Sequence, residues 1–398
     1  MQPQPVYYGW ANLALAALAM VATLPGRTQG LGLITEPLLA DLQLDRVTYA
    51  SFNLWATLIG AAFCLPFGKL TDRLGSRIII TGLIASLGGT VVLMSQTRAF
   101  AAIFIAITLT RGLGQSSLSI ASLALVGKWF ARRLHLAMGT YSVLVGIGFI
   151  AAFPAVGHAV LTAGWRTAWL GVGIALLAVF APLSWIFVRD SHQQKEDPEG
   201  LADQHTDLNP AQALRSPAFW VFALSSSVFG LVYSGIALFN QSILEQRGFD
   251  AKTYYNVLVL STMVGLAANF AGGWLATFWP IQRLMGLGMV ILGVSLVSLP
   301  MVRTQAQVTA YALTMGIAGG IVTVVFFSVW GQVFGRTHLG KIQGYAQMMT
   351  VFASAVGPLL LAETLRSTGS YDLIFNCLAA VVAVLAVGCW IVPVPVRA

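Results

Sequence analysis

The stretch Gly68-Lys-Leu-Thr-Asp-Arg-Leu-Gly-Ser-Arg77 decides the fold of this chain. It is short, polar and strongly basic, and a long apolar segment lies on each side of it. A polar loop of this size between two apolar helices acts through its charges and its glycines. Gly68 and Gly75 permit a tight backbone or a close approach between helices. Asp72 is expected to pair with Arg73 or Arg77, or with the positive N-terminal end of a neighbouring helix.

The composition is that of an integral membrane protein. Of the 398 residues, 57% are hydrophobic and only 9% are charged. Apolar runs long enough to cross a bilayer as helices recur along the whole chain. We therefore predict an all-α integral membrane fold with about twelve transmembrane helices. The predicted segments cover roughly 9–35, 48–68, 77–95, 100–126, 136–160, 167–188, 218–243, 253–275, 283–302, 307–328, 342–362 and 371–392.

The net charge of +8 comes from basic residues in alternate loops, which argues against a nucleic-acid partner. Thirteen Lys and Arg residues fall in one set of loops and seven in the other, a bias that marks the cytoplasmic side. The larger set is Lys69, Arg73, Arg77, Lys128, Arg132, Arg133, Arg189, Lys195, Arg215, Arg283, Arg336, Lys341 and Arg397, and the smaller is Arg46, Arg98, Arg166, Arg247, Lys252, Arg303 and Arg366. We predict a multi-pass protein of the plasma membrane (a bacterial inner membrane) with both termini in the cytoplasm.

The longest polar stretch, residues 189–215, divides the chain. It is charged and contains Pro198 and Pro210, which is typical of a linker. We predict a six-helix bundle over 1–188, a cytoplasmic linker over 189–215 and a second six-helix bundle over 216–398. Weak similarity between the halves is consistent with two bundles related by pseudo-symmetry, with a site between them near the midplane.

The pattern G-x-L-x-D-R-x-G-x-R resembles the signature loop between the second and third helices of the major facilitator superfamily. Three further stretches are similar to the monocarboxylate and oxalate-formate branches: Lys128-Trp-Phe-Ala-Arg-Arg133, Gly164-Trp-Arg-Thr-Ala-Trp169 and Phe334-Gly-Arg-Thr-His-Leu-Gly340. The resemblance implies a secondary transporter that works by alternating access. It also implies a gating role for the signature loop, on Gly68, Asp72, Arg73, Gly75 and Arg77.

An arginine in the middle of the fourth apolar segment is the strongest candidate for a ligand contact. Arg111 lies near the bilayer centre, where a charge is costly and needs a partner or water. The stripe Thr108, Arg111, Gln115, Ser119 and Ser122 follows 3/4 spacing and is predicted to share one helix face towards a wet cavity. A structural arginine that locks helices together is the alternative. The resemblance also places Arg111-Gly-Leu-Gly-Gln115 on the family's fourth-helix arginine motif, near the cavity and the proton path.

A second arginine lies in the first apolar segment. Arg27 is flanked by Pro25-Gly26 and by Gly30, which predicts a locally irregular helix that lines protein or water. The alternative is that Arg27 reaches to the interface along its aliphatic stem.

The second half has no charge at membrane depth and offers neutral groups instead. Tyr233, Asn240 and Gln347 are predicted to bind the far end of a small ligand, and helix–helix contacts are the alternative. A proton-relay carboxylate is not evident, so a coupling proton stays an open question. No metal cluster, cofactor motif or nucleophile–base pair appears, and the chain is not expected to be an enzyme.

We therefore expect a monomeric transporter, embedded in the lipid bilayer, for a small anionic solute of the monocarboxylate type. Two arginines in the first half indicate that the anionic group docks there. The alternative is a drug or neutral-metabolite exporter of the same fold; the absence of a Gly-Pro pair in the fifth segment counts against drug efflux. A sensor that kept the fold without transport is a further possibility, against which the intact Asp72 argues.

Overall fold

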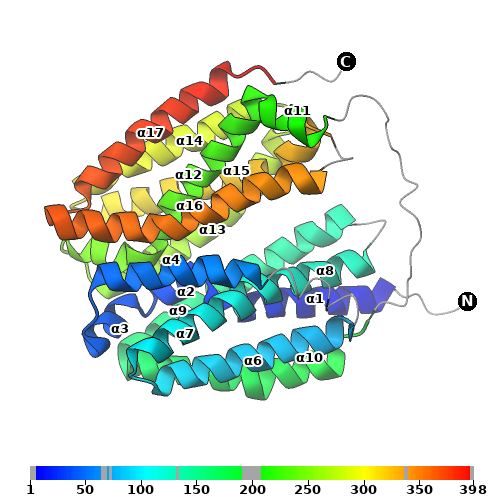
Figure 1. Ribbon diagram of the computed structural model, residues 1–398, viewed down its shortest axis with the longest axis vertical. Coiled ribbons are helices and arrows are strands. Elements are labelled where there is room, and N and C mark those ends of the chain that lie inside the picture. Colours follow the sequence, from blue (N-terminus) through cyan, green and yellow to red (C-terminus); the bar gives the residue numbers. More distant parts are fainter. Residues whose placement is uncertain are drawn as a thin grey trace, which may run out of the picture. The chain divides into compact units, whose positions relative to one another are not determined.

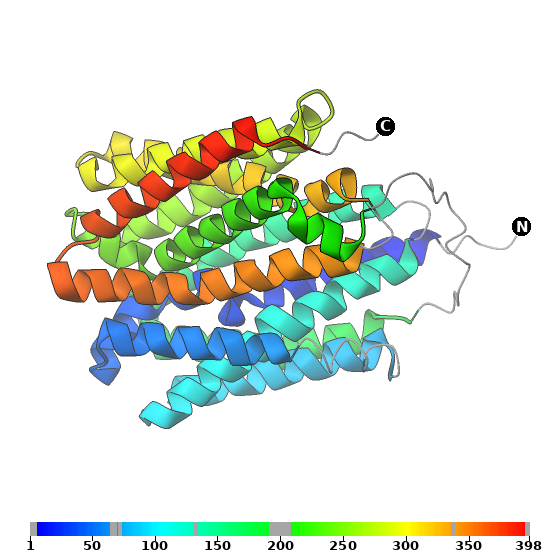
Figure 2. The same ribbon diagram turned by 45° about the horizontal axis from the view of Figure 1, so that its top comes forward.

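The computed structural model describes residues 6–63, 70, 74–130, 134–190, 208–335 and 339–394. The chain divides into two compact units, Met1–Asp197 and Pro198–Ala398. The described secondary structure of both units is helical (Figure 1, Figure 2).

Among the described residues of the first unit, three helical stretches are long and apolar enough to cross a membrane: Tyr8–Gly26, Ser76–Gln96 and Ala137–Phe187. Its helices are α1 (Val6–Ala22), η1 (Leu24–Gly26), α2 (Thr28–Gly32), α3 (Thr35–Leu42), α4 (Arg46–Ala62), α6 (Ser76–Gln96), α7 (Phe100–Thr110), η2 (Arg111–Leu118), α8 (Ser119–Trp129), α9 (Leu134–Ala175), η3 (Leu176–Phe180) and α10 (Ala181–Phe187). Gly164 adopts φ 81° and ψ 159° inside the long α9 and divides it into two helical parts. The run α7–η2–α8 is helical without interruption from Phe100 to Trp129.

In the described part of the second unit, six helices are long and apolar enough to cross a membrane. Its helices are α11 (Pro210–Arg215), α12 (Pro217–Glu245), α13 (Ala251–Leu275), α14 (Ile281–Ser298), η4 (Leu299–Met301), α15 (Gln305–Val333), α16 (Leu339–Thr368) and α17 (Asp372–Ile391). Gly316 and Gly320 of α15 pack directly on the backbone of α13, where an added Cβ would lie 2.7 Å from Ser261 O and 2.4 Å from Gly265 O. Close backbone contact of this kind replaces the hydrophobic drive that lipid cannot supply.

The first crossing is broken, as the sequence around Arg27 predicts. The α-helix ends at Ala22, a single 3₁₀ turn holds Pro25, and Arg27 is extended at φ −86° and ψ 152°. The chain then re-forms short helices up to Leu42. This break turns backbone carbonyls and the Thr28 side chain towards η2, and it positions the candidate site described below.

The start of α4 is fixed by a side-chain cap. Asp45 Oδ1 accepts the Thr48 backbone N–H at 2.9 Å and Asp45 Oδ2 accepts the Thr48 hydroxyl at 2.5 Å. The Thr48 hydroxyl, followed by its N–H, holds the pKa of this carboxyl below its usual range.

Asp45→Ala is expected to lower the free energy of unfolding by about 1 kcal/mol at pH 7. A lowered folded-state pKa stabilises the fold above the unfolded pKa of about 3.9, and this contribution is lost as the pH falls through the folded value. The difference in melting temperature between wild type and variant should therefore shrink below about pH 4. A difference that does not change with pH would mean that the carboxylate charge contributes nothing.

Candidate functional site

Arg111 lies at the junction of α7 and η2, and the residue is 2% exposed. Arg111 Nη1 donates to Thr28 Oγ1 at 2.8 Å, to Gln115 Oε1 at 2.6 Å and to Gly26 O at 3.4 Å. Arg111 Nη2 donates to Asn53 Oδ1 at 2.8 Å. All four acceptors are neutral. The Arg111 Nε atom is buried and has no hydrogen-bond partner in the described part of the chain.

The orientation of the two amides follows from the chemistry of arginine, which donates hydrogen bonds and cannot accept them. Asn53 and Gln115 must therefore turn their oxygens to Arg111. Asn53 Nδ2 is used within α4, where it donates to Tyr49 O at 3.0 Å. Gln115 is exposed, and its Nε2 group remains as a double donor that a ligand can use. Gln115 thus connects the buried cation to an accessible surface.

The helix that carries Arg111 and Gln115 is a π-helix over Arg111–Leu118. Ser117 Oγ accordingly donates to Gly112 O, five residues back, at 2.9 Å. Such π segments are frequent at functional sites. The wider turn alters the single polar face that the 3/4 spacing predicts. Arg111 and Gln115 contact each other, whereas Ser122 donates to Ala16 O at 2.8 Å.

A glycine makes the approach between η1 and η2 possible. A Cβ on Gly26 would lie 2.1 Å from Thr110 O and 3.1 Å from Gln115 N. Any side chain at this position pushes the broken first crossing away from the helix that carries the arginine. Thr28 would then move out of reach of Arg111 Nη1.

Gly26→Ala is expected to lower the free energy of unfolding by about 1–3 kcal/mol, the usual cost of overpacking, and to weaken ligand binding. Gly89→Ala is the matched control, because a Cβ there meets nothing within 4 Å. Melting temperature and ligand affinity, measured on both variants, check this. If Gly26→Ala melts like Gly89→Ala, the close approach is not required.

Arg27 lies near the same helix but makes different contacts. Its Nε donates to Thr23 Oγ1 at 2.7 Å and its Nη2 to Ser119 Oγ at 3.4 Å, and its guanidinium lies 5.2 Å from the Phe149 ring centroid. The side chain is half-buried, so it is more accessible than Arg111. The sequence did not indicate that Arg27 is more accessible than Arg111.

The other predicted ligand contacts belong to the second unit. Asn240 is buried on α12 and its Oδ1 accepts the Tyr311 hydroxyl at 3.2 Å. Tyr233 is half-buried on the same helix and stacks on Phe229 with ring centroids 5.4 Å apart. Gln347 is exposed on α16. Their part in a common site with the arginines stays a prediction.

The signature stretch is described in part: Gly68, Asp72 and Arg73 lie outside the described residues. Gly75 has φ +86°, a conformation that favours glycine, and precedes α6. The backbone N–H groups of Ser76 and Arg77 donate to Asp190 Oδ1 at 2.5 and 3.4 Å.

The end of α10 and the residues that follow it contact three other helices of the first unit: α6, α1 and α8. The Arg77 guanidinium lies 4.4 Å from the Trp185 ring centroid, and its Nε donates to Trp185 O. Arg189 O accepts from Asn12 Nδ2 of α1 and from Trp129 Nε1 of α8, both at 3.1 Å. The signature loop is therefore attached, through α6, to the chain that leads into the linker. The Asp190 carboxylate, which accepts from the backbone of Ser76 and Arg77, was not singled out from the sequence.

Two partners of Arg111, Asn53 and Thr28, were also missed as site residues. Asn53 is an amide inside an apolar segment, and this was the available signal. Pairing it with Arg111, 58 residues away, requires knowledge of which helices pack together.

Comparison with known proteins agrees with this architecture. A profile of the Major Facilitator Superfamily matches residues 13–358. Monocarboxylate transporter 13 of Rattus norvegicus is 26% identical over 390 residues, which cover 94% of this chain and 86% of that protein. The chloramphenicol resistance protein of Pseudomonas aeruginosa is 25% identical over 377 residues, 88% of this chain and 82% of that protein.

Solved structures share the fold at low sequence identity. The nucleoside transporter NupG superposes with a TM-score of 0.76 at 12% identity, covering 95% of this chain and 98% of its own. A bacterial homologue of the human lysosomal transporter Spinster, in an inward-facing and unoccupied conformation, gives 0.71 at 15% identity, over 97% and 94% of the two chains. The expectations of an all-helical membrane fold and of a transporter rather than an enzyme are confirmed. The chain belongs to the Major Facilitator Superfamily and is a secondary transporter of a small solute.

Proposed function

We propose that this transporter carries a small organic anion of the monocarboxylate type by alternating access, and that the anion binds beside Arg111. One observation carries the proposal. A buried arginine on a membrane-crossing segment has four hydrogen bonds, all to neutral acceptors. Its positive charge is therefore not neutralised by a carboxylate among the described residues.

Electrostatics favour an anion at such a position. Arginine stays protonated in proteins, and an uncompensated charge at membrane depth is costly, so such residues mark substrate and ion pathways. A carboxylate that enters the site can accept two parallel hydrogen bonds from the guanidinium and adds the attraction between opposite charges. A neutral solute can accept hydrogen bonds from Arg111 but does not neutralise its charge.

The ligand carboxylate is proposed to replace Gln115 on the Arg111 guanidinium. The exposed side chain of Gln115 holds Arg111 Nη1 through the amide oxygen, at 2.6 Å. A ligand carboxylate can replace this oxygen on the guanidinium and accept from the released amide. We propose that Arg27 contacts the same anion and that Tyr233, Asn240 and Gln347 bind its uncharged end.

The relatives support this choice and also define its rival. Several monocarboxylate transporters are similar to the chain at 22–26% identity, and a chloramphenicol resistance protein is similar at 25%. An exporter of an uncharged drug is therefore the second candidate. Arg111 separates the two, because chloramphenicol has no carboxylate to pair with it.

The proposed topology places both termini, the Gly68–Arg77 loop and the 189–215 linker in the cytoplasm of a bacterial cell, with the chain a monomer in the inner membrane. The charge bias supports it. Single cysteines placed in these loops should resist membrane-impermeant reagents in intact cells, and labelling of the linker from outside would refute the topology.

The gate is proposed to consist of Gly68, Asp72, Arg73, Gly75 and Arg77. Asp72→Asn should shift the population towards the inward-open state, because the two states differ by only a few kcal/mol and one charge contact is enough to bias them. The labelling rate of cytoplasmic cysteines should rise. Asp250→Asn, which changes an exposed helix cap, is the control. Equal labelling in both variants would give Asp72 a local role only.

The proposed function is tested by transport in proteoliposomes. A panel of short monocarboxylates, their neutral amides and chloramphenicol, each offered as a gradient, should give flux of the carboxylates alone. The same assay with and without a proton gradient shows whether a proton is coupled. Flux of chloramphenicol without flux of any carboxylate would favour the exporter.

A further inference from the structure

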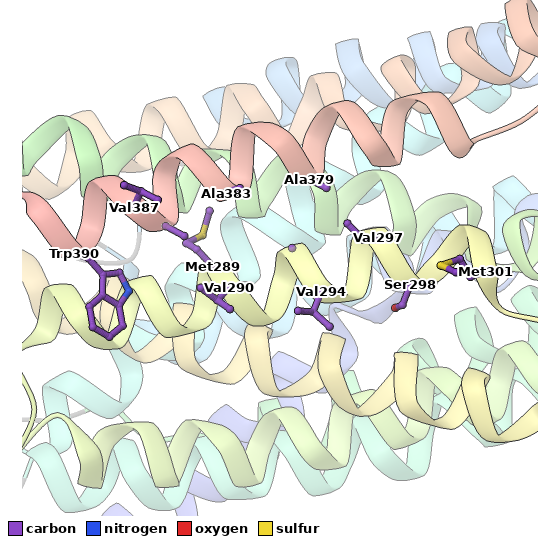
Figure 3. A pocket seen from close by; sticks show the side chains of 12 residues that line it. Met289, Val290, Val294, Val297, Ser298, Met301, Ala379, Ala383, Val387 and Trp390 are labelled. Carbon is purple, nitrogen blue, oxygen red and sulfur yellow. The ribbon is translucent and has the colours of Figure 1, made fainter.

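A groove runs along two neighbouring helices of the second unit, α14 and α17 (Figure 3). Its volume is about 810 Å³. We refer to it as the α14–α17 groove. Its lining residues are Met289, Val290, Gly293, Val294, Val297, Ser298, Met301, Ala379, Ala383, Ala386, Val387 and Trp390.

The chemistry of the lining selects an apolar occupant. Ser298 and the indole N–H of Trp390 are the polar side-chain groups in it, and the rest is aliphatic or thioether. The absence of bulk at Gly293, Ala379 and Ala383 makes the surface concave. In Figure 3, Trp390 marks one end of the groove and Met301 the other.

The groove lies within the membrane-crossing length of both helices. Val294 is 55% exposed and Met301 67% exposed, so the lining is open to the surroundings. Gly286, on which Trp390 packs, and Met301 are fifteen residues apart, about 22 Å along a helix. The groove is therefore longer than the roughly 15 Å of one leaflet, half of a hydrocarbon core about 30 Å thick. One lipid acyl chain that enters at the Trp390 end can lie in the part of the groove that is nearest to Trp390, and its chemistry suits the lining.

The Trp390 end also carries a group that suits a lipid phosphate. The Trp390 indole packs on Gly286, where an added Cβ would lie 2.5 Å from Trp390 Nε1. Arg283 is exposed and lies one helical turn before Gly286, two turns before Val290 of the lining. Tryptophan is enriched at the membrane interface and arginine in cytoplasmic loops, and arginine binds phosphate with two parallel hydrogen bonds.

We propose that the α14–α17 groove binds one acyl chain of an anionic phospholipid whose phosphate contacts Arg283. With the topology proposed above, this is a lipid of the cytoplasmic leaflet. The site is independent of the anion site on the first unit. A second copy of the chain fits less well, because a stable interface uses about 20–30 residues a side and twelve line the groove.

Native mass spectrometry of the full chain, with phosphatidylglycerol or phosphatidylcholine of identical acyl chains, tests the proposal. The wild type should retain one phosphatidylglycerol per chain, about fivefold in preference to phosphatidylcholine, as one basic side chain near a headgroup provides. Ala383→Trp fills the groove and should abolish retention of both lipids. Val384→Trp, on an exposed neighbour outside the lining, should not.

Arg283→Gln should remove the preference for phosphatidylglycerol while one lipid is still retained. Arg303→Gln, at the opposite end of α14, is the matched control and should leave the preference unchanged. Melting temperatures of both tryptophan variants verify folding. Equal lipid retention in the two tryptophan variants would overturn the proposal, as would a wild-type dimer that Ala383→Trp converts to a monomer. Loss of the preference in Arg303→Gln alone would overturn the headgroup assignment.

Discussion

Gln115→Glu is expected to stabilise the ligand-free protein and to abolish anion binding. The substitution keeps the size of the side chain and places a carboxylate where the amide oxygen now accepts from Arg111 Nη1 at 2.6 Å. The wild-type hydrogen bond already involves the charged guanidinium, so the substitution adds the attraction between two opposite charges, about 1 kcal/mol for a pair with an exposed partner, and unfolding should require about that much more free energy. Because Gln115 is exposed, the new carboxylate loses little hydration.

The bound carboxylate of the solute and the new side chain would compete for the same cation. Anion affinity should therefore fall by about 100-fold or more, where each tenfold step is 1.4 kcal/mol. Melting temperature and equilibrium binding of the purified variant check the two effects together. Gln305→Glu is the control, because it changes the net charge equally at an exposed position on α15. A Gln115→Glu protein that still binds carboxylates like the wild type would remove Arg111 from the site.

Arg111→Lys and Arg111→Ala should separate ligand binding from helix packing. The guanidinium reaches Thr28 and Gln115 through one nitrogen and Asn53 through the other. A lysine ammonium cannot reproduce this planar two-sided contact. Arg111→Lys should weaken anion binding about 10–100-fold, and Arg111→Ala should abolish it. Arg27→Ala should weaken it less, because Arg27 lies at the more peripheral position.

The alanine variant also tests the structural role of Arg111. Its removal leaves Asn53 Oδ1 buried without a donor, which costs about 1–3 kcal/mol. Some loss of stability is therefore expected in Arg111→Ala, whereas Arg111→Lys should melt closer to the wild type. Arg98→Lys, an exposed conservative change, is the control. A large loss of stability in both Arg111 variants, with unchanged affinity in the folded fraction, would show that Arg111 only holds helices together.

The sequence predicted those features that depend on short-range spacing. Apolar runs predicted the apolar helices, Pro25 and Gly26 indicated the break in the first of them, and the four-residue spacing of Arg111 and Gln115 indicated that they share a helix face, on which they are in contact. The predicted polar face from Thr108 to Ser122 was less accurate beyond Gln115. A π-helix there changes the spacing of residues that share a face, and the local sequence pattern does not indicate a π-helix.

Contacts between helices could not be read from the chain. Asn53 and Thr28 meet Arg111 only because α4, α2 and η2 pack together, and Asp190 reaches α6 across 114 residues of sequence. The relative accessibility of Arg27 and Arg111 has the same origin. Burial is a property of packing, whereas depth in an apolar segment is a property of position along one helix.

The central claim is that the solute is recognised as an anion by Arg111. The most direct measurement is equilibrium binding of lactate and of its neutral amide to the purified wild type, followed by the shift in melting temperature that ligand binding produces. We expect that the carboxylate binds and raises the melting temperature, that the amide does not, that Arg111→Lys reduces the difference and that Arg111→Ala removes it. Equal binding of the two compounds, or binding of chloramphenicol alone with Arg111→Lys indifferent, would contradict it.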